Sequence, residues 1–468
     1  MKKTGLFKII MFTLLGILLV SWFVPASYFT DGNLSSLGMY RIGFFDFFQL
    51  LFGTFEFTYF IQIFILLVSI GALYGVLIKT GKYGALIEKI ASKFKGKEQV
   101  FLIAAAFLIA ALTSVFDYGL LLFIFIPAII SIILAMGYDK LTACITTFGA
   151  ILIGTIGTTL GYNIVGVINE QIKGTLTTAL TYKIGMFVLC FSALVVYLLK
   201  AKKSKKIDKD EIKSSDMFAG EKISNKYSVA PIIVIFSILF VLLIMGCTAW
   251  NSTFGVSAFD TFNTKVSEVS IKGFAIFGEL LGTVNALGQW YYAEMSIMCL
   301  LSALILGRFY RMKHKDVFTY MADGAKKMLA PALMIVLVYA VIFFAGNTMF
   351  YPTIADFILK ATSKFNIFFS TIVMILGSAL HVDMLYVASY VIPQIAAQDV
   401  SSTVLAVLTQ GVYGVTMFVA PTSAILVLGL SYLNIPYTEW IKKTWKLVLI
   451  LFAIVLIALI LALSLIHI

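Results

Sequence analysis

The sequence has few charged residues. Asp, Glu, Lys and Arg make up 12% of its 468 residues, whereas 61% are hydrophobic. Soluble domains carry about 25% charged residues, so this composition excludes an ordinary soluble protein. Apolar runs of about 20 residues recur along the chain, and each is long enough to cross a bilayer as a helix. These runs lack the alternation of a membrane β-barrel. The sequence therefore predicts an all-α polytopic membrane protein.

Residue types that hold metals or perform catalysis are also scarce. The chain has four cysteines and three histidines, and the cysteines fall in or beside apolar segments without metal-ligand spacing. HExxH, CxxC and Gly-x-Ser-x-Gly motifs are absent from the sequence. The stretch GTIGTTLG (residues 154–161) lacks the preceding strand and the lysine of a nucleotide-binding loop. We therefore expect no enzyme activity, no metal site and no cofactor.

The net charge of +12 is distributed like a topology signal rather than a nucleic-acid-binding surface. Lys and Arg cluster at residues 2–8, 79–97, 200–226, 308–327 and 442–446. Basic loops face the cytoplasm, which predicts a multi-pass protein of the cell membrane with a cytoplasmic N-terminus and about nine full spans. These lie near residues 7–25, 57–79, 141–168, 182–200, 228–249, 292–308, 328–346, 401–430 and 447–466.

This topology requires two apolar regions, near 99–138 and 366–398, to return to the side they left. The second has 33 residues, or roughly 50 Å of helix at about 1.5 Å per residue. Two full crossings and a turn need about 40 residues, so we predict re-entrant hairpins, the first entering from the cytoplasm and the second from outside. The predicted organisation is a first membrane half (1–200), a charged cytoplasmic linker (201–227) and a second half (228–468).

The two halves share an internal repeat. Asp117 lies ten residues before Pro127, and Asp383 lies ten residues before Pro393, in two otherwise apolar segments. KIASKF (89–94) and KATSKF (360–365) precede the two hairpins, while IGTTL (156–160) and APTSAI (420–425) lie in long spans interrupted by Gly or Pro. The predicted topology runs the halves in opposite directions. Inverted repeats with two broken helices are typical of secondary transporters.

Two blocks, GYDKLTACITTFGAILIGTIGTTLGYNIVGV (137–167) and VAPTSAILVLGLSYLNIPYTEWIKK (419–443), resemble the DcuC/YfcC-type carriers of the ion-transporter superfamily. Members are C4-dicarboxylate carriers or arginine/ornithine exchangers. The resemblance implies a scaffold, a transport domain with two opposed hairpins, and a homodimer. Family members often carry paired acids at the first tip, Asn-Pro-Phe in the first broken helix and Gly-Asp-Gly in the second. This chain instead has Asp-Tyr (117–118), Tyr-Asn-Ile (162–164) and Gly-Val-Tyr-Gly (411–414).

The candidate substrate-binding residues are polar side chains at the predicted tips and breaks. A buried acid costs about 2.5–3.5 kcal/mol at the centre of a bilayer, so Asp117 and Asp383 are predicted to be functional, although each could cap a helix N-terminus. His381 is either a proton carrier or a hydrogen-bonded packing residue. The candidate Ser and Thr side chains at the broken helices could instead hydrogen-bond to the backbone of their own helix. The full set is Thr113, Ser114, Asp117, Thr158, Thr159, Asn163, Ser378, His381, Asp383, Thr422 and Ser423.

Two aromatic clusters, at 44–60 and 290–292, are interpreted as interfacial belts rather than binding surfaces. The hairpins and broken helices, as predicted, contain two acids and one histidine but no Lys or Arg. This favours alternating-access transport of an amino acid, with exchange of the arginine/ornithine type, over a channel. The alternative is a carrier of C4-dicarboxylates or other carboxylates coupled to Na⁺ or H⁺, and a cation/proton antiporter is less favoured. The expected partners are a small-molecule substrate and the lipid bilayer.

Overall fold

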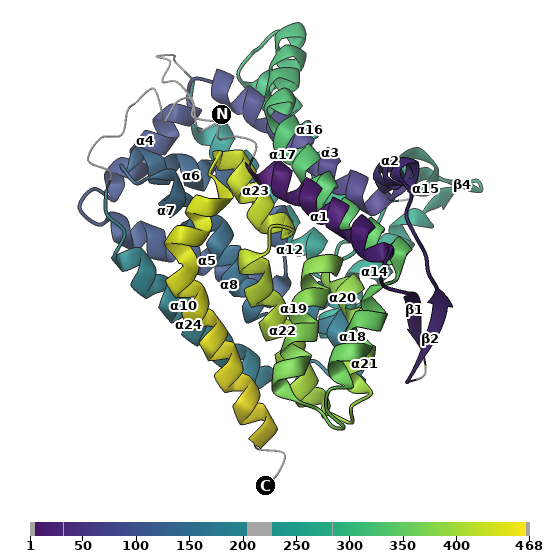
Figure 1. Ribbon diagram of the computed structural model, residues 1–468. Helices are drawn as coiled ribbons and strands as arrows, with labels where there is room; N and C mark the ends of the chain where they lie inside the picture. The colour runs from purple at the N-terminus through teal and green to yellow at the C-terminus, as the bar shows by residue number, and fades with distance from the viewer. Residues whose placement is uncertain (1–4, 31, 204–226, 283, 465–468) are drawn as a thin grey trace.

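The computed structural model describes residues 5–30, 32–203, 227–282 and 284–464, and it is helical almost throughout (Figure 1). The strands in these ranges form two small antiparallel pairs: β1 (Ala26–Thr30) with β2 (Asn33–Gly38), and β3 (Ser270–Ile271) with β4 (Phe274–Ala275). The predicted linker lies outside the described residues except for 201–203 and 227. The helical membrane class is confirmed.

The helices fall in two series along the chain. The first comprises α1 (Gly5–Ser21), α2 (Phe44–Gly53), α3 (Thr58–Lys79), α4 (Tyr83–Lys93), α5 (Glu98–Phe116), α6 (Ile126–Ala135), α7 (Lys140–Cys144), α8 (Ala150–Ile156), α9 (Val167–Ile172) and α10 (Leu180–Leu199). The second comprises α12 (Ala230–Cys247), α13 (Trp250–Phe254), α14 (Ala258–Ser267), α15 (Ile276–Leu281), α16 (Tyr292–Phe309), α17 (His314–Thr348), α18 (Tyr351–Leu359), α19 (Ile367–His381), α20 (Met384–Tyr390), α21 (Ile392–Ala396), α22 (Ser402–Val419), α23 (Ala424–Leu433) and α24 (Tyr437–Ser464).

Within the described residues, eight helical segments are long and apolar enough to cross a membrane. They are α3, α5, α10, α12, α16, α17, α22 with α23, and α24. Seven of them coincide with predicted spans, whereas α5 is predicted to be one arm of a hairpin. Two predicted spans do not qualify: α1 is a single helix of 17 residues, and the segment from α7 to α9 is divided into shorter helices. The exact number of nine spans therefore stays a prediction.

Both predicted hairpins are helix–turn–helix units whose turns fall at the expected aspartates. In the first, α5 ends at Phe116, and the chain returns through a 3₁₀ turn (Gly119–Ile124) and α6. In the second, α19 ends at His381 and α20 begins at Met384. Each turn contains a residue with positive φ, 57° at Asp117 and 56° at Val382. Whether the two units re-enter the membrane stays a prediction.

Both predicted broken helices are present. The first passes from α7 through a π-helical turn (Ile145–Gly149) into α8, stops at Ile156, and resumes through a second π-helical turn (Tyr162–Gly166) into α9. The second stops between α22 and α23 at residues 420–423. A side chain of α22 stabilises the first break, because Gln410 Nε2 donates to the carbonyl oxygens of Ile156 (3.1 Å) and Thr158 (2.8 Å).

The two halves repeat the same order of elements. A long helix (α3 or α17) leads to a short one (α4 or α18), then to a hairpin, a broken helix and a final long helix (α10 or α24). The two halves meet near the middle of Figure 1, where α8 of the first broken helix packs against α22 of the second. The predicted division of the chain into halves, and their opposite directions in the membrane, stay predictions.

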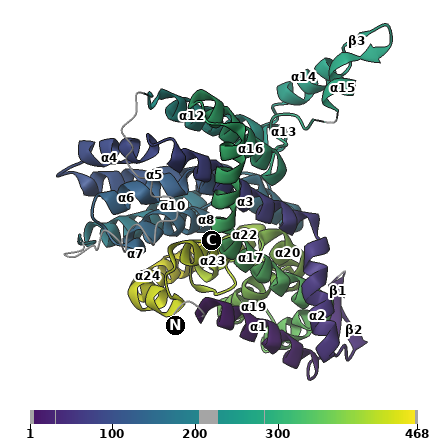
Figure 2. The same ribbon diagram turned by 90° about the horizontal axis from the view of Figure 1, so that it is seen from above.

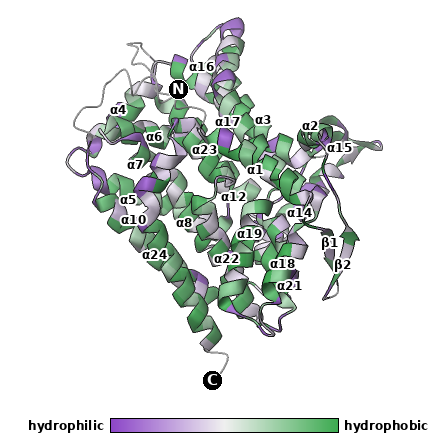
Figure 3. Cartoon of the chain, in the orientation of Figure 1, coloured by the Kyte–Doolittle hydropathy of each residue, from purple (hydrophilic) through white to green (hydrophobic). Residues whose placement is uncertain are grey.

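The helices α3, α12, α16 and α17 are called the scaffold below. Two of them, α3 and α17, cross at glycines. A Cβ on Gly324 would collide with the carbonyl oxygen of Gly71 and lie 2.7 Å from Cα of Gly75. Small residues allow such close backbone contact between membrane helices. Figure 2 shows α14, β3 and α15 projecting away from the scaffold, and Figure 3 shows hydrophobic helix bodies with hydrophilic residues concentrated towards helix ends and connections.

Candidate functional site

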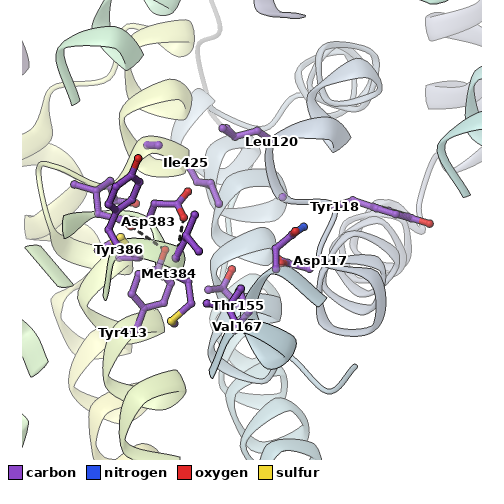
Figure 4. Close-up of a pocket in the computed structure, with 18 of the residues that line it drawn as sticks. Asp117, Tyr118, Leu120, Thr155, Val167, Asp383, Met384, Tyr386, Tyr413 and Ile425 are labelled. Atoms are coloured by element: carbon purple, nitrogen blue, oxygen red, sulfur yellow. Dashed lines mark hydrogen bonds between the residues drawn. The ribbon is translucent and has the colours of Figure 1, made fainter. Parts of the chain in front are cut away.

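A cavity of about 470 Å³ lies between the scaffold and the turns of both hairpins. Its walls include Asp117 from the first turn and Asp383 from the second, although 266 residues separate them in the sequence. In Figure 4 the two aspartates approach the cavity from opposite sides, each carried by a different half of the chain. The internal repeat thus brings the two acids into one site.

Asp383 is held in place from two sides. Its Oδ1 accepts a hydrogen bond from the backbone N–H of Leu385 (3.0 Å), so it caps the N-terminus of α20. Its Oδ2 accepts a hydrogen bond from the hydroxyl of Tyr59 on α3 (3.0 Å). The capping alternative weighed for this residue is correct, and it coexists with a position on the cavity wall.

Asp117 is held only through its backbone. It ends α5 in the left-handed conformation, and its N–H donates to the carbonyl oxygen of Thr113 (2.9 Å). Gly161 of the first break packs so closely against it that a Cβ there would collide with the Asp117 side chain. The expectation that Asp117 could cap a helix N-terminus is wrong. Its carboxylate accepts no hydrogen bond from the part of the chain that the structure describes, so it remains open to a ligand.

A cluster of tyrosines from the scaffold faces the two acids. Tyr59 of α3 has ring contacts with Tyr291 (6.3 Å between centroids), Tyr292 (5.8 Å) and Tyr339 (6.0 Å). All four line the cavity, together with Tyr413 of α22. The interpretation of 44–60 and 290–292 as interfacial belts is therefore wrong for Tyr59, Tyr291 and Tyr292. The sequence does not show which way these aromatic side chains face, and this is why the prediction placed them at the membrane interface.

The charge on the cavity wall is entirely negative among the described residues. Besides the two aspartates, Glu170 lines the cavity and accepts a hydrogen bond from the hydroxyl of Tyr162 (3.1 Å). Sequence analysis missed Glu170 because the first broken helix continues to Ile172, four residues beyond the predicted end of the span at 168. Among the residues that the structure describes, no Lys or Arg lines this cavity.

The part of the cavity wall where α23 begins carries hydrogen-bond donors instead of acidic groups. Ser423, Ala424 and Ile425 line the cavity, and Ser423 Oγ accepts a hydrogen bond from the N–H of Leu426 (3.4 Å). The N–H groups of the first helical turn have no partner within their own helix. A helix N-terminus of this kind attracts a carboxylate. The cavity thus has acidic groups at the hairpin turns and backbone donors at the second break.

Of the eleven predicted site residues, four line the cavity: Asp117, Asn163, Asp383 and Ser423. Three of the other seven, Ser114, Thr159 and Thr422, join hairpins to broken helices. Ser114 Oγ donates to the carbonyl oxygen of Gly157 (2.6 Å), and the N–H of Thr159 donates to the carbonyl oxygen of Ser114 (2.7 Å). In the second half, the Thr422 hydroxyl donates to the carbonyl oxygen of Ala379 (2.8 Å). These hydroxyls fix the turns that carry the aspartates.

The remaining predicted residues are buried away from the cavity. Thr113 and Thr158 bond back to carbonyl oxygens of their own helices, at Ile109 and Gly154 respectively. Ser378 Oγ and both ring nitrogens of His381 are buried without a hydrogen-bond partner among the described residues. The His381 ring stacks on Tyr390 (4.9 Å) and meets Tyr351 edge-on (5.1 Å). The hydrogen-bonded alternative for His381 is therefore wrong, although its ring is packed.

Hydrogen bonds near both aspartates connect the hairpin turns to the scaffold. One is the bond between Tyr59 and Asp383. The other joins the hydroxyls of Tyr118, next to Asp117, and Thr248 at the end of α12 (2.6 Å). Each turn thus has its own polar contact with the scaffold. Over the residues that the structure describes, no group of three or more His, Cys, Asp or Glu side chains could hold a metal ion.

Comparisons with known proteins were made for the whole chain. The sequence model of the family described as DcuC, C4-dicarboxylate anaerobic carrier, matches residues 4–464. No curated protein sequence matches the chain. Similar solved structures include the YdaH transporter of Alcanivorax borkumensis (13% identity, 97% of this chain and 98% of that chain, TM-score 0.44). MtrF of Neisseria gonorrhoeae, described within a class of antimetabolite efflux pumps, has 12% identity over 97% of this chain and 93% of that chain, with a TM-score of 0.41.

Proposed function

The chain belongs to the DcuC family of C4-dicarboxylate anaerobic carriers, and we propose that it is a secondary transporter. From the lining of its cavity, we further propose that its substrate carries a positive charge. The best fit is a cationic amino acid, taken up or released in exchange of the arginine/ornithine type. One observation carries this proposal: a single cavity is lined by Asp117, Asp383 and Glu170 and, among described residues, by no Lys or Arg.

Electrostatics decides between a cationic and an anionic substrate end at the hairpin turns. Two unit charges about 4 Å apart interact by roughly 4 kcal/mol at an effective dielectric constant of about 20. The sign is favourable for an ammonium or guanidinium beside Asp117 and Asp383 and unfavourable for a carboxylate. The rings of Tyr59, Tyr291 and Tyr292 add faces on which a cation can lie.

The α-carboxylate of an amino acid finds its complement at another part of the cavity wall. The first turn of α23 offers backbone donors at Ala424 and Ile425, and Ser423 lies beside them. An anion at a helix N-terminus is stabilised by these donors and by the helix dipole. A substrate with one cationic end and one carboxylate therefore matches both regions of the cavity.

Alternating access follows from the position of the cavity between two groups of helices. The tyrosines belong to the scaffold, whereas the aspartates belong to hairpins that are bonded to the broken helices. We infer that the hairpins and broken helices move together against the scaffold, because hydroxyl–backbone bonds join them to each other. The contacts of Tyr59 with Asp383 and Tyr118 with Thr248 break and re-form in this movement.

The second candidate substrate is a C4-dicarboxylate, which the description of the family favours. For such a dianion, Asp117 and Asp383 would have to be neutralised by bound Na⁺ or by protons. The donors at α23 could then hold one carboxylate. This candidate predicts uptake that requires an ion gradient, whereas amino-acid exchange requires substrate on both sides.

Transport in proteoliposomes distinguishes the two candidates. Vesicles loaded with ornithine should take up labelled arginine, and vesicles given labelled succinate should not accumulate it, with or without a Na⁺ gradient. Asp117→Asn and Asp383→Asn should each weaken arginine uptake about 10- to 100-fold, since a hydrogen bond to a charged group contributes about 1.5–3 kcal/mol.

Asp356→Asn is the matched control. Asp356 lies on α18, pairs with Lys360 (2.8 Å) and is remote from the cavity lining, so its loss should leave arginine uptake unchanged. Succinate uptake that depends on Na⁺, together with no arginine exchange, would overturn the cationic proposal and leave the dicarboxylate candidate.

A further inference from the structure

A second cavity is separate from the substrate cavity. It is a groove of about 700 Å³ lined by α4, the first hairpin and α12. Figure 2 shows the positions of these helices. Its walls are formed by Leu86 and Ile90 of α4, Ile129 of α6, and Ile233 and Phe240 of α12, with further apolar residues of the same elements. None of the residues lining the substrate cavity lines this groove.

The groove is closed on one side by aromatic packing. Phe125, at the start of α6, contacts Phe236 (6.0 Å between centroids) and Phe240 (5.9 Å) on α12. Tyr74 of α3 lies behind them, with its ring 6.1 Å from Phe236 and its hydroxyl bonded to the carbonyl oxygen of Ile124 (2.9 Å). The aromatic floor of the groove therefore lies where the first hairpin meets the scaffold.

The length of the groove matches one leaflet of a bilayer. The residues of α12 that line it form one stripe, from Val229 to Val241. Twelve residues of helix rise roughly 18 Å, whereas half of the hydrocarbon core is about 15 Å thick. An acyl chain that enters from one membrane surface would be covered along its length.

Two lysines stand at one end of this apolar groove. Lys89 and Lys93 are four residues apart on α4, so they project from the same helix face. Apart from Tyr83 and Ser237, they are the only polar side chains on the described walls, and no acidic side chain lines the groove. The groove thus combines an apolar wall with two lysine ammonium groups, and no acidic side chain of the lining neutralises them.

We place the lysines and the start of α12 at the same membrane surface, because contacts connect the helix ends around them. Lys79, at the end of α3 just before α4, places its ammonium 5.6 Å from the ring of Tyr320 near the start of α17. The end of α16 leads directly into α17, and its Tyr310 hydroxyl donates to the carbonyl oxygen of Ser228 before α12 (2.8 Å). The groove therefore runs inward from the surface that carries Lys89 and Lys93.

We propose that this groove binds an anionic phospholipid, with its phosphate at Lys89 and Lys93 and one acyl chain between α12 and the first hairpin. Basic residues at a membrane surface attract anionic headgroups, and the apolar stripe supplies the hydrophobic contact. Self-association through the same groove is the alternative that the experiment below distinguishes from lipid binding. The lipid lies between the first hairpin and the scaffold, and its binding does not depend on which substrate is transported.

Native mass spectrometry of the purified chain tests the lipid site directly. Phosphatidylglycerol and phosphatidylcholine with identical acyl chains are titrated separately. We expect preferential binding of phosphatidylglycerol, and a loss of about 10- to 30-fold in its affinity when Lys89→Gln and Lys93→Gln are combined. Phosphatidylcholine binding should be unaffected by this pair of changes.

Lys95→Gln with Lys97→Gln is the control, because these exposed lysines follow α4 but do not line the groove. A wall variant, Ile233→Trp, fills the groove from a residue that is 51% exposed and therefore tolerates substitution; it should weaken binding of both lipids. Equal affinity for the two lipids, an equal loss in the control, or disulfide-linked dimers of Ile233→Cys in membranes would overturn the proposal, and the last would assign the groove to a second copy.

Discussion

Asp117 and Asp383 occupy equivalent turns but have different environments. Asp383 is fixed by a helix N-terminus and by the Tyr59 hydroxyl, whereas the carboxylate of Asp117 accepts no bond from the described residues. We therefore expect the two acids to have different roles. Asp117 is the more available group for a cation, and we propose that Asp383 responds to the position of the scaffold through its bond with Tyr59.

Tyr59→Phe tests this division at the level of one hydroxyl. The ring packing remains, but Asp383 loses its hydrogen bond to the scaffold. A hydrogen bond to a charged group contributes about 1.5–3 kcal/mol, so we expect the half-saturating concentration of arginine to rise about 10-fold or more. Initial rates of uptake over a range of arginine concentrations measure this.

Tyr386→Phe provides the comparison. Tyr386 also lines the cavity, but the structure shows no hydrogen bond from its hydroxyl to either aspartate. Its loss should change the half-saturating concentration less than 2-fold, which is about the size of an ordinary surface substitution. Equal effects of the two variants would show that the bond between Tyr59 and Asp383 has no special role.

The acids could be predicted from the sequence, and the tyrosines could not. An ionised side chain in an apolar segment is costly, so Asp117 and Asp383 were conspicuous. A tyrosine is acceptable in a core, at an interface or in a cavity. Tyr291 and Tyr339 come from different scaffold helices, and only their packing shows that they meet the hairpin turns. Predicted hydroxyls such as Ser114 and Thr422 were correctly placed near the turns, but they bind backbone there rather than lining the cavity.

At the scale of elements, the crossing of α3 and α17 is the tightest contact of the scaffold. Gly324→Ala places a methyl group against the backbone of Gly71 and Gly75, which cannot move away without separating the helices. Overpacking of this kind costs typically 1–3 kcal/mol. We expect a lower thermal unfolding midpoint in detergent and less monodisperse protein.

Gly346→Ala is the matched control on the same helix. A Cβ at Gly346 has no atom within 4 Å, and alanine favours a helix over glycine by about 1 kcal/mol. Its unfolding midpoint should be unchanged or higher. If Gly324→Ala were as stable as Gly346→Ala, the close approach of α3 and α17 would be wrong.

Helices were easier to predict than their interruptions. Long apolar runs identify α3, α12 and α24 because burial in lipid requires them. The π-helical turns flanking the first break and the extension of that helix to Ile172 depend on contacts with other elements, such as Gln410 with the carbonyl oxygens at the break. No local pattern reports a contact across 250 residues.

At the scale of the whole molecule, membrane topology depends on the hairpins. α5 is long enough to cross a bilayer, yet the alternation of basic loops predicts that the first hairpin returns to its own side. Single cysteines at Lys95 and Asp139, before and after this hairpin, should react with a membrane-impermeant reagent from the same side. Cysteines at Ser363 and Ala397, which flank the second hairpin, should react together from the opposite side.

Thr175→Cys supplies the reference for this labelling. Thr175 is exposed after the first broken helix, so it should react from the side opposite to Asp139. The four native cysteines must be replaced first, although three are buried. Reaction of positions 95 and 139 from opposite sides would make α5 a full span and would remove the inverted arrangement of the two hairpins.

The most direct test of the central claim is an experimental structure of the protein with arginine bound in a lipid nanodisc. We predict the guanidinium between Asp117 and Asp383, against the Tyr59 and Tyr291 rings, and the α-carboxylate at the first turn of α23. Arginine outside this cavity, or succinate bound with a carboxylate against a Na⁺ ion held by the two aspartates, would contradict a site built for a positively charged substrate.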